Sequence, residues 1–374
     1  MNTVVSMEQG GALPLPVCPA ALAEVWSGAS SLLRVVNIVD EAPDVKTFIF
    51  EPERPALFRY KAGQFLTLEL PTQSGALLRT YTIASTPSRP MTVSVTVKCQ
   101  VGSVGTRWMF ENLSVGGLLH AIGPAGTFTL DLSRRQKQLF ISAGSGITPM
   151  MSMIRWMSDV LPGADVTFLH CARSPSDIIF RDELAVIARS MHKLRIGYIV
   201  EKGAAGWTGV CGRLDIGRLE SLSPDFLERE IFCCGPEPFM NGVQSVLDAR
   251  GFAPDHYHQE AFTFAAPITQ PIVSDPPVNR LKSENSLSET PIRFLSSELE
   301  GMAGADETVL GVARRCGVRI LSVCEIGLCG TCKVRKTAGD VDMQHNGGIT
   351  DDEIQEGYIL ACCSKPLSAL EIEA

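Results

Sequence analysis

The apolar runs of this sequence change in character near residue 132, and this change most restricts the folds open to the chain. Up to that point, short runs such as LLRVVNIV, VKTFIF, QFLTLEL and MTVSVTVK are separated by Gly, Pro and Ser turns, a pattern typical of antiparallel strands. Beyond it, near-continuous apolar runs such as QLFISAG, DVTFLHCA and EIFCCG alternate with helix-like segments. Because strands of a parallel sheet are buried on both faces, we predict an antiparallel β-barrel or sandwich over 31–132 and a parallel α/β domain over 133–262.

The rest of the chain divides into three further segments. Residues 1–30 lack periodicity and are predicted to be an N-terminal extension. Residues 263–290 are rich in Pro and Ser, which predicts a linker between domains. Residues 291–374 are predicted to form a compact α+β domain, whose helix should begin near Asp306 as the N-cap residue and end at Gly317.

Composition excludes two classes of partner. The chain contains no apolar run long enough to span a bilayer, which takes roughly 18 residues or more, and its first residues lack the basic flank of a signal peptide. We therefore expect a cytoplasmic protein without a membrane partner. The net charge of -8 argues against nucleic acid as a partner.

Five of the 12 cysteines lie near the C-terminus in an informative pattern. Cys324, Cys329 and Cys332 form C-x4-C-x2-C, and Cys362 and Cys363 follow farther along. In a chain expected to be cytoplasmic, such a group indicates metal or redox chemistry rather than disulfides. The spacing is that of plant-type ferredoxins, which bind a 2Fe-2S cluster. A zinc site is the alternative, but zinc prefers two C-x2-C-like pairs.

Segment 291–374 resembles the plant-type ferredoxin family over roughly its whole length, which implies the β-grasp fold of that family. The resemblance assigns the cluster ligands as Cys324, Cys329, Cys332 and Cys362. It favours Cys362 over Cys363, because in that family the fourth ligand precedes a chain reversal in the context that LAC has here.

The predicted barrel contains RTYTIAST at Arg79–Thr86, followed by VTVKCQVGSVGTRWM. This combination resembles the flavin-binding barrel of the ferredoxin reductase superfamily. The resemblance implies that Arg79 neutralises the flavin pyrophosphate, that Tyr81 stacks on the isoalloxazine and that the Thr82 hydroxyl lies near flavin N5. It implies that Thr106, in a turn that opens a short helix, binds phosphate through its hydroxyl and backbone N–H. The other flavin-binding residues that it implies are Thr80, Val97, Gly102 and Ser103.

Ser103 stands where many relatives have a second glycine, which leaves both FAD and FMN open. We expect FAD.

The α/β segment carries the stretch FISAGSGITPMM, at the end of a predicted strand and the start of a helix. There the backbone at Gly144 and Gly146 can approach a pyrophosphate bound over the helix N-terminus. Thr148 and Pro149 complete the motif, and proline at its last place resembles the nicotinamide domain of the same superfamily.

Two later stretches resemble further parts of that superfamily's active site. In IFCCGPEPFM, the motif Cys234-Gly235-Pro236 resembles the one whose cysteine lies beside the nicotinamide C4. In HQEAF, Glu260 and Phe262 resemble the acid and the aromatic residue near the flavin. The resemblance thus implies Thr82, Cys234 and Glu260 as the catalytic group.

The sequence gives conflicting signals about the nicotinamide. A 2'-phosphate needs Arg, Lys or hydroxyl groups after the second strand, whereas an acid usually holds a bare ribose. Arg173, Ser174 and Arg181 stand there, with Asp177 nearby. We expect NADH, because relatives with this order of domains mostly use it, and NADPH stays open.

Together the three domains predict an enzyme that passes electrons from NADH through flavin to the iron-sulfur cluster and on to an acceptor. The order of domains and strings such as SAGSGITPMMSM and EGYILACCSKP resemble reductase components of Rieske-type oxygenases that demethylate quaternary ammonium compounds, the glycine betaine and stachydrine systems. The acceptor implied is such an oxygenase. The alternatives are a reductase of hybrid-cluster protein or of another oxygenase, a stand-alone NADH diaphorase, and a non-enzymatic redox sensor.

Overall fold

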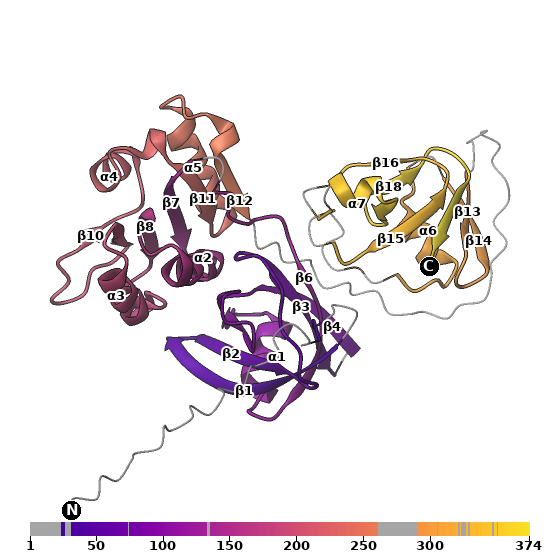
Figure 1. Ribbon diagram of the computed structural model, residues 1–374, viewed down its shortest axis with the longest axis horizontal. Coiled ribbons are helices and arrows are strands. Elements are labelled where there is room, and N and C mark those ends of the chain that lie inside the picture. The colour runs from indigo at the N-terminus through magenta and orange to yellow at the C-terminus, as the bar shows by residue number, and fades with distance from the viewer. Residues whose placement is uncertain are drawn as a thin grey trace, which may run out of the picture.

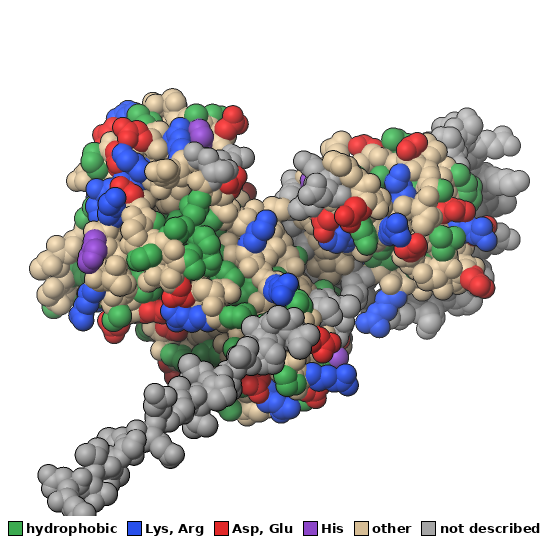
Figure 2. Space-filling view, viewed as in Figure 1, with side chains coloured by type: hydrophobic (Ala, Val, Ile, Leu, Met, Phe, Trp, Pro, Cys, Tyr) green, Lys and Arg blue, Asp and Glu red, His purple; other side chains and the backbone are tan. Residues whose placement is uncertain are grey.

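A computed structural model shows three units, each built on its own sheet (Figure 1). It describes residues 24–26, 31–73, 75–132, 135–260, 290–304, 306–320, 322, 327, 330–345, 348, 349 and 351–374. No helix in these residues is long and apolar enough to cross a membrane. On the visible face of all three units, side chains of both charge signs are interspersed (Figure 2).

The first unit is an antiparallel barrel, as predicted. Its sheet order is β4-β3-β6-β1-β2-β5, and an isolated antiparallel bridge between Ile83 and Val95 joins the two end strands. Large side chains, among them Phe48, Phe50 and Leu68, fill its interior. The strands are β1 (Ser31–Ala42), β2 (Val45–Pro52), β3 (Phe65–Thr72), β4 (Gly75–Thr82), β5 (Val93–Lys98) and β6 (Leu118–Ala125), with helix α1 at Val104–Asn112.

The barrel also includes residues that the sequence assigned to the N-terminal extension. The Trp26 side chain is only 5% exposed, and its ring centroid lies 5.2 Å from that of Phe58. Val25 forms a parallel bridge with Leu57. The extension predicted for 1–30 therefore needs correction at its end, because one large aromatic side chain can bury substantial apolar area against a neighbouring loop without any periodic pattern.

The second unit is the predicted parallel α/β domain. Its sheet has the order β10-β9-β8-β7-β11-β12, and every neighbouring pair is parallel. The strands are β7 (Lys137–Ala143), β8 (Asp165–Ala172), β9 (Leu194–Val200), β10 (Val210–Cys211), β11 (Glu230–Cys234) and β12 (Tyr257–Glu260). The helices are α2 (Ile147–Val160), α3 (Arg181–Ser190), α4 (Ile216–Leu222) and α5 (Glu237–Asp248), with short 3-10 turns at Gly144–Gly146, Pro175–Asp177, Phe226–Glu228 and Pro254–His256.

Two apolar cores lie on opposite faces of this sheet. Residues of α2 and α3 pack with Phe140, Phe168 and Phe232 on one side, and residues of α4 and α5 pack with Leu139 and Ile231 on the other. Burial on both faces explains why these strands read as continuous apolar runs. The chain runs outward from β7 to β8 and β9, and then returns to place β11 on the other side of β7, so β7 and β11 flank the switch point of the topology.

The third unit is an α+β fold with the sheet order β14-β13-β19-β15-β17 and a separate β16-β18 pair. Its helix ends as predicted, since Gly317 follows it with φ +78°. The N-cap residue is Thr308 rather than Asp306, because the Thr308 hydroxyl accepts from the Gly311 N–H. The elements are β13 (Thr290–Phe294), β14 (Leu299–Ala303), α6 (Val309–Arg315), β15 (Lys333–Ala338), β16 (Val341–Met343), α7 (Asp351–Gln355), β17 (Tyr358–Leu360), β18 (Ser364–Pro366) and β19 (Leu370–Glu373).

The predicted linker 263–290 lies outside the described residues except for its last member, Thr290, which opens β13. The domain boundaries as a whole stay a prediction.

Candidate functional site

Two loops meet at the carboxyl ends of β7 and β11. A Cβ atom on Gly146 would lie 2.3 Å from the backbone oxygen of Cys234 and 2.7 Å from the backbone nitrogen of Gly235. Gly144 has φ +54°, in the left-handed region. Residues of the G-x-G turn and of the Cys-Gly-Pro motif, which lie far apart in the chain, therefore form one surface at the switch point, where open α/β sheets bind their ligands.

Helix α2 begins at this surface. Its N-cap residue, Gly146, offers no side chain to cap it, and Thr148 and Pro149 are buried in its first turn. The Thr148 hydroxyl donates to the backbone oxygen of Ser145 at 3.1 Å. The first N–H groups of a helix have no partner within that helix, and together with the helix dipole they favour an anion. The arrangement fits a dinucleotide pyrophosphate.

On the barrel side, Arg79 lies against the start of α1. A Cβ atom on Gly105 would lie 3.2 Å from the Arg79 Cγ atom, so the strand and the helix N-terminus are in close contact. The side chain of Ser103, the N-cap residue of α1, accepts from the Thr106 N–H. The Arg79 Nη1 atom donates to the backbone oxygen of Leu78 at 2.8 Å, and the guanidinium keeps further donors. An Arg side chain beside a helix N-terminus suits a phosphate group, so these residues fit the diphosphate of a flavin.

Four predicted flavin-binding residues have environments that the sequence did not indicate. The hydroxyl and the N–H of Thr106 are the two groups expected to hold phosphate. The hydroxyl accepts from the Gln100 N–H at 3.2 Å and the N–H donates to the Ser103 hydroxyl, so both also hold the turn together. The Thr106 hydroxyl still has its own proton to donate to a phosphate. Val97 is 2% exposed in the barrel core and pairs with Lys46 of β2, whereas Thr80 is exposed. Gly102 has φ +82°, which favours glycine there.

The three residues predicted to be catalytic come together across the two units. Glu260 is the register partner of Cys234 in the β11–β12 pair, and its side chain is hydrogen-bonded to Thr82 of the barrel. The Glu260 Oε2 atom has no hydrogen-bond partner among the described residues. An orphaned buried oxygen beside Thr82 and Cys234 is consistent with a site that a polar ring atom of a bound cofactor would complete.

Burial controls the protonation of this group. It raises the pKa of Glu260 to about 8, and the Thr82 hydrogen bond opposes the rise. Burial, and then the charge of Glu260, raise the pKa of the Cys234 thiol well above its usual range. Burial also raises the pKa of Tyr81. Near neutral pH, Glu260 therefore carries a proton and Cys234 remains a thiol.

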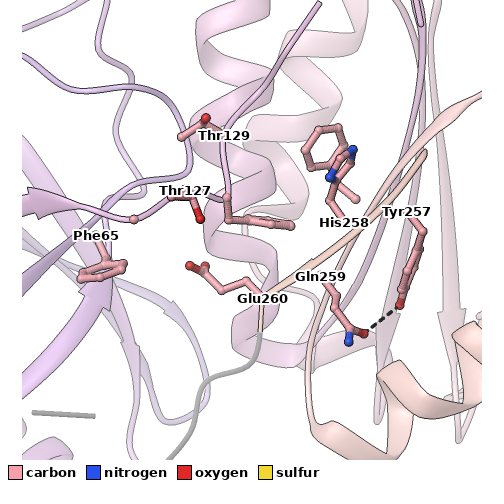
Figure 3. Close-up of a pocket in the computed structure, with 10 residues that line it drawn as sticks. Phe65, Thr127, Thr129, Tyr257, His258, Gln259 and Glu260 are labelled. Atoms are coloured by element: carbon pink, nitrogen blue, oxygen red, sulfur yellow. Dashed lines mark hydrogen bonds between the residues drawn. The ribbon is translucent and has the colours of Figure 1, made fainter. Parts of the chain in front are cut away.

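Glu260 points into a cavity of about 300 Å³ between the barrel and the α/β unit. Figure 3 shows its carboxylate directed toward Thr127 and Phe65 of the barrel. On the other side of the cavity the His258 ring is stacked on Phe232, with centroids 4.8 Å apart. The sequence analysis did not single out Phe65, Thr127 or His258. His258 could have been predicted, because side chains alternate along a strand, so that His258 and Glu260 lie on the same face of β12.

The buried carboxyl predicts a pH dependence of stability. Between the ordinary pKa of 4.5 and the folded-state pKa of about 8, the folded state binds more protons than the unfolded state, so stability falls as pH rises. One such proton changes the free energy of unfolding by about 1.4 kcal/mol per pH unit, so the loss should be about 2 kcal/mol between pH ~6 and ~7.5.

In Glu260→Gln this loss should disappear, as chemical unfolding at both pH values would show. Glu53→Gln, which removes an exposed acid, should keep the wild-type loss. An equal loss in Glu260→Gln and the wild type would contradict a protonated Glu260.

At the end of β8, Arg173 is exposed, and the Ser174 hydroxyl donates to the Asp177 carboxylate at 2.7 Å. The carboxylate is thus held just after β8, the second strand of this domain, and an acid there usually holds a bare ribose, which is consistent with NADH. The choice between NADH and NADPH stays a prediction, as does the role of Arg173.

In the third unit, Cys332 and Cys362 are both buried in one apolar core. The Ala361 N–H donates to the backbone oxygen of Cys332 at 3.0 Å, which brings the two cysteines close together. Cys324, Cys329 and Phe262 lie outside the described residues. The structure brings together two of the four predicted ligands, and the complete ligand set stays a prediction.

Comparison with known families agrees with this geometry. The oxidoreductase FAD-binding domain matches residues 32–130, the oxidoreductase NAD-binding domain matches 140–245, and the 2Fe-2S iron-sulfur cluster binding domain matches 295–367. The barrel, the α/β unit and the C-terminal unit are therefore the FAD, NAD and 2Fe-2S domains of an oxidoreductase.

Individual relatives extend over nearly the whole chain. The stachydrine N-demethylase reductase subunit of Rhizobium meliloti is 47% identical over 93% of this chain and 98% of its own. The glycine betaine monooxygenase reductase subunit of Pseudomonas aeruginosa is 41% identical over 94% of this chain and 97% of its own. The solved structure of phthalate dioxygenase reductase has the same fold, with a TM-score of 0.56 and 24% identity over 92% of this chain and 98% of that one. This chain belongs to the family of reductase subunits with FAD, NAD and 2Fe-2S domains.

Proposed function

We propose that this chain is the NADH-dependent reductase of a Rieske-type oxygenase that demethylates a quaternary ammonium compound such as glycine betaine or stachydrine. The observation that carries the proposal is the 47% identity to a stachydrine N-demethylase reductase subunit over 93% of the chain. A 41% identity to a glycine betaine monooxygenase reductase subunit supports the same class of substrate.

Bound FAD would take a hydride from the reduced nicotinamide and give its electrons singly to the 2Fe-2S cluster, chemistry that side chains do not supply. The protein's own residues bind and orient. The N-terminus of α2 would hold the nicotinamide pyrophosphate, and Arg79 with the N-terminus of α1 would hold the flavin phosphates. Gly146 lets the Cys234 backbone approach, which would bring the thiol to the reacting face.

Thr82 and Glu260 supply a hydrogen-bonded hydroxyl and carboxyl at the same place, and the carboxyl holds its proton near neutral pH. A positioned proton donor at this point suits a flavin that gains and loses a proton at N5 as it changes redox state. No charged acid–base pair is needed, because the nicotinamide provides the hydride.

Reconstitution tests the proposal. The purified reductase, carrying FAD and its cluster, is mixed with a purified Rieske-type oxygenase that acts on glycine betaine, and with one that acts on stachydrine. Demethylation consumes one O2 and one NADH for each formaldehyde released, so we expect formaldehyde only when reductase, oxygenase, NADH and substrate are all present. Reduction of dyes with no support of either oxygenase would contradict the proposed partner.

Two outcomes with the reductase alone, before any oxygenase is added, would also contradict the proposal. A purified protein that reduces no dye with NADH or NADPH would refute the oxidoreductase assignment. Rapid NADH oxidation by O2 that survives deletion of residues 264–374 would instead favour a stand-alone diaphorase.

A further inference from the structure

One face of α2 holds the barrel segment that follows the flavin strand β4. The Ser152 hydroxyl donates to the backbone oxygen of Ser85 at 2.6 Å, and the Arg155 Nη1 atom donates to the backbone oxygen of Ala84 at 2.5 Å. One turn farther, Asp159 is paired with Arg89. These helix residues are spaced by three and four, so they lie on one face of α2.

Arg155 also contacts the α/β unit on its other side. Its Nε and Nη2 atoms donate to both carboxylate oxygens of Glu183, on α3, at 2.7 and 2.5 Å. Its Cζ atom lies 4.7 Å from the ring centroid of Phe180. Phe180 is the N-cap residue of α3 and has φ +57°, a conformation that is costly for a bulky residue and so needs support from its surroundings.

A single guanidinium thus joins two segments that meet the cofactors from opposite sides. Ala84 lies two residues after Thr82, and Phe180 closes the segment that begins at Arg173, where the adenosine ribose of the dinucleotide would lie. The Arg155 side chain is only 14% exposed. The planar guanidinium of Arg155 makes two charge-assisted hydrogen bonds to the Glu183 carboxylate, which leaves neither side chain much freedom to move.

We propose that Arg155 is a positioning residue for hydride transfer: its bonds to Ala84 and Glu183 set the orientation of the α/β unit relative to the barrel, and so the distance between nicotinamide and flavin. The inference rests on the proposed function, because it requires that hydride passes between these two units. Efficient transfer requires reacting atoms about 3–3.5 Å apart, and a misplacement of about 1 Å can cost about 100-fold in rate.

The same interface supplies a matched control. Arg89 bonds to Asp159 through two nitrogens, at 3.1 and 2.7 Å, but its side chain is 72% exposed. Exposed ion pairs contribute little to stability. Arg89→Met therefore removes a barrel cation that contacts the same face of α2, without opening the link between Thr82 and α3.

The test compares Arg155→Met, Arg155→Lys and Arg89→Met in the full-length holoprotein. Stopped-flow absorbance gives the rate of flavin reduction by NADH, its dependence on NADH concentration, and the long-wavelength charge-transfer band that reports contact between flavin and nicotinamide. In Arg155→Met, we expect a rate about 100-fold lower and loss of the band, with half-saturation by NADH changed no more than about threefold. Arg155→Lys should recover only part of the rate, because a lysine ammonium cannot make the two parallel hydrogen bonds of a guanidinium. Arg89→Met should behave as the wild type.

A second readout does not depend on activity. In the protein freed of flavin, hydrogen exchange should become faster in the segments 83–89 and 173–183 together in Arg155→Met, and in neither of them in Arg89→Met. If Arg155→Met fails to fold, Arg155→Lys gives the same comparison.

Three outcomes separate the inference from the function on which it rests. A wild-type rate and band in Arg155→Met would overturn the positioning role while leaving the proposed function intact. Equal losses in Arg155→Met and Arg89→Met would overturn it as well, since the effect would then be general to the interface. A wild-type protein whose flavin is reduced by neither NADH nor NADPH would overturn the proposed function itself.

Discussion

Replacement of Cys362 by Ser is expected to abolish the 2Fe-2S cluster and, with it, the reduction of cytochrome c. Cys362 is buried in the same core as Cys332, and the backbone pairing of Ala361 with Cys332 holds the two residues together. A serine hydroxyl is a poor substitute for the thiolate that iron-sulfur clusters require. Ferricyanide reduction by NADH should be spared, because it needs only the FAD and NAD domains. Visible absorbance of the cluster and the two dye assays measure these effects.

Cys363→Ser is the matched control for this prediction. The Cys363 thiol donates to the Leu360 backbone oxygen at 3.7 Å, and a Cβ atom on Gly327 would lie 2.7 Å from the Cys363 sulfur. This sulfur therefore lies against the loop that carries the first cysteines, close enough for its loss to be informative. We expect Cys363→Ser to keep the cluster. Loss of the cluster in Cys363→Ser, with retention in Cys362→Ser, would reverse the ligand assignment.

Replacement of Gly146 by Ala should nearly abolish reduction of the flavin by NADH. The added Cβ would lie 2.3 and 2.5 Å from backbone atoms of Cys234, and backbone cannot move aside as the end of a side chain can. The G-x-G turn and the Cys234 loop must then separate, which displaces the nicotinamide from the flavin. We expect at least about a 100-fold lower rate in stopped-flow measurements with NADH.

Chemical reduction and a second glycine provide the controls. After reduction by dithionite, Gly146→Ala should still pass electrons to cytochrome c, because the flavin and cluster domains are untouched. Gly242→Ala, in α5 with nothing within 4 Å of the added Cβ, should keep the wild-type rate and gain up to about 1 kcal/mol of stability from helix propensity. A wild-type NADH rate in Gly146→Ala would show that close approach of the two loops is not needed.

Local patterns predicted the elements well where one signal acted alone. The continuous apolar runs correctly predicted β7, β8 and β11, because burial on both faces removes polar residues from the strand. Around α6 two good N-cap residues compete within three positions, and Thr308 rather than Asp306 caps the helix. Trp26 was missed, because a single aromatic anchor has no period to detect.

The three domains, their order and the chemistry that they carry could be predicted from the chain alone, since cysteine spacing and glycine placement are local properties. Which of those residues meet depends on the packing of the elements in three dimensions. Thr82 lies beside Glu260 because β4 and β12, which belong to different sheets, both end where the barrel meets the α/β unit. Arg155 reaches Ala84 and Glu183 because α2 lies between the barrel and α3. Such contacts depend on how whole helices and strands pack against one another, so the spacing of residues within one segment does not predict them.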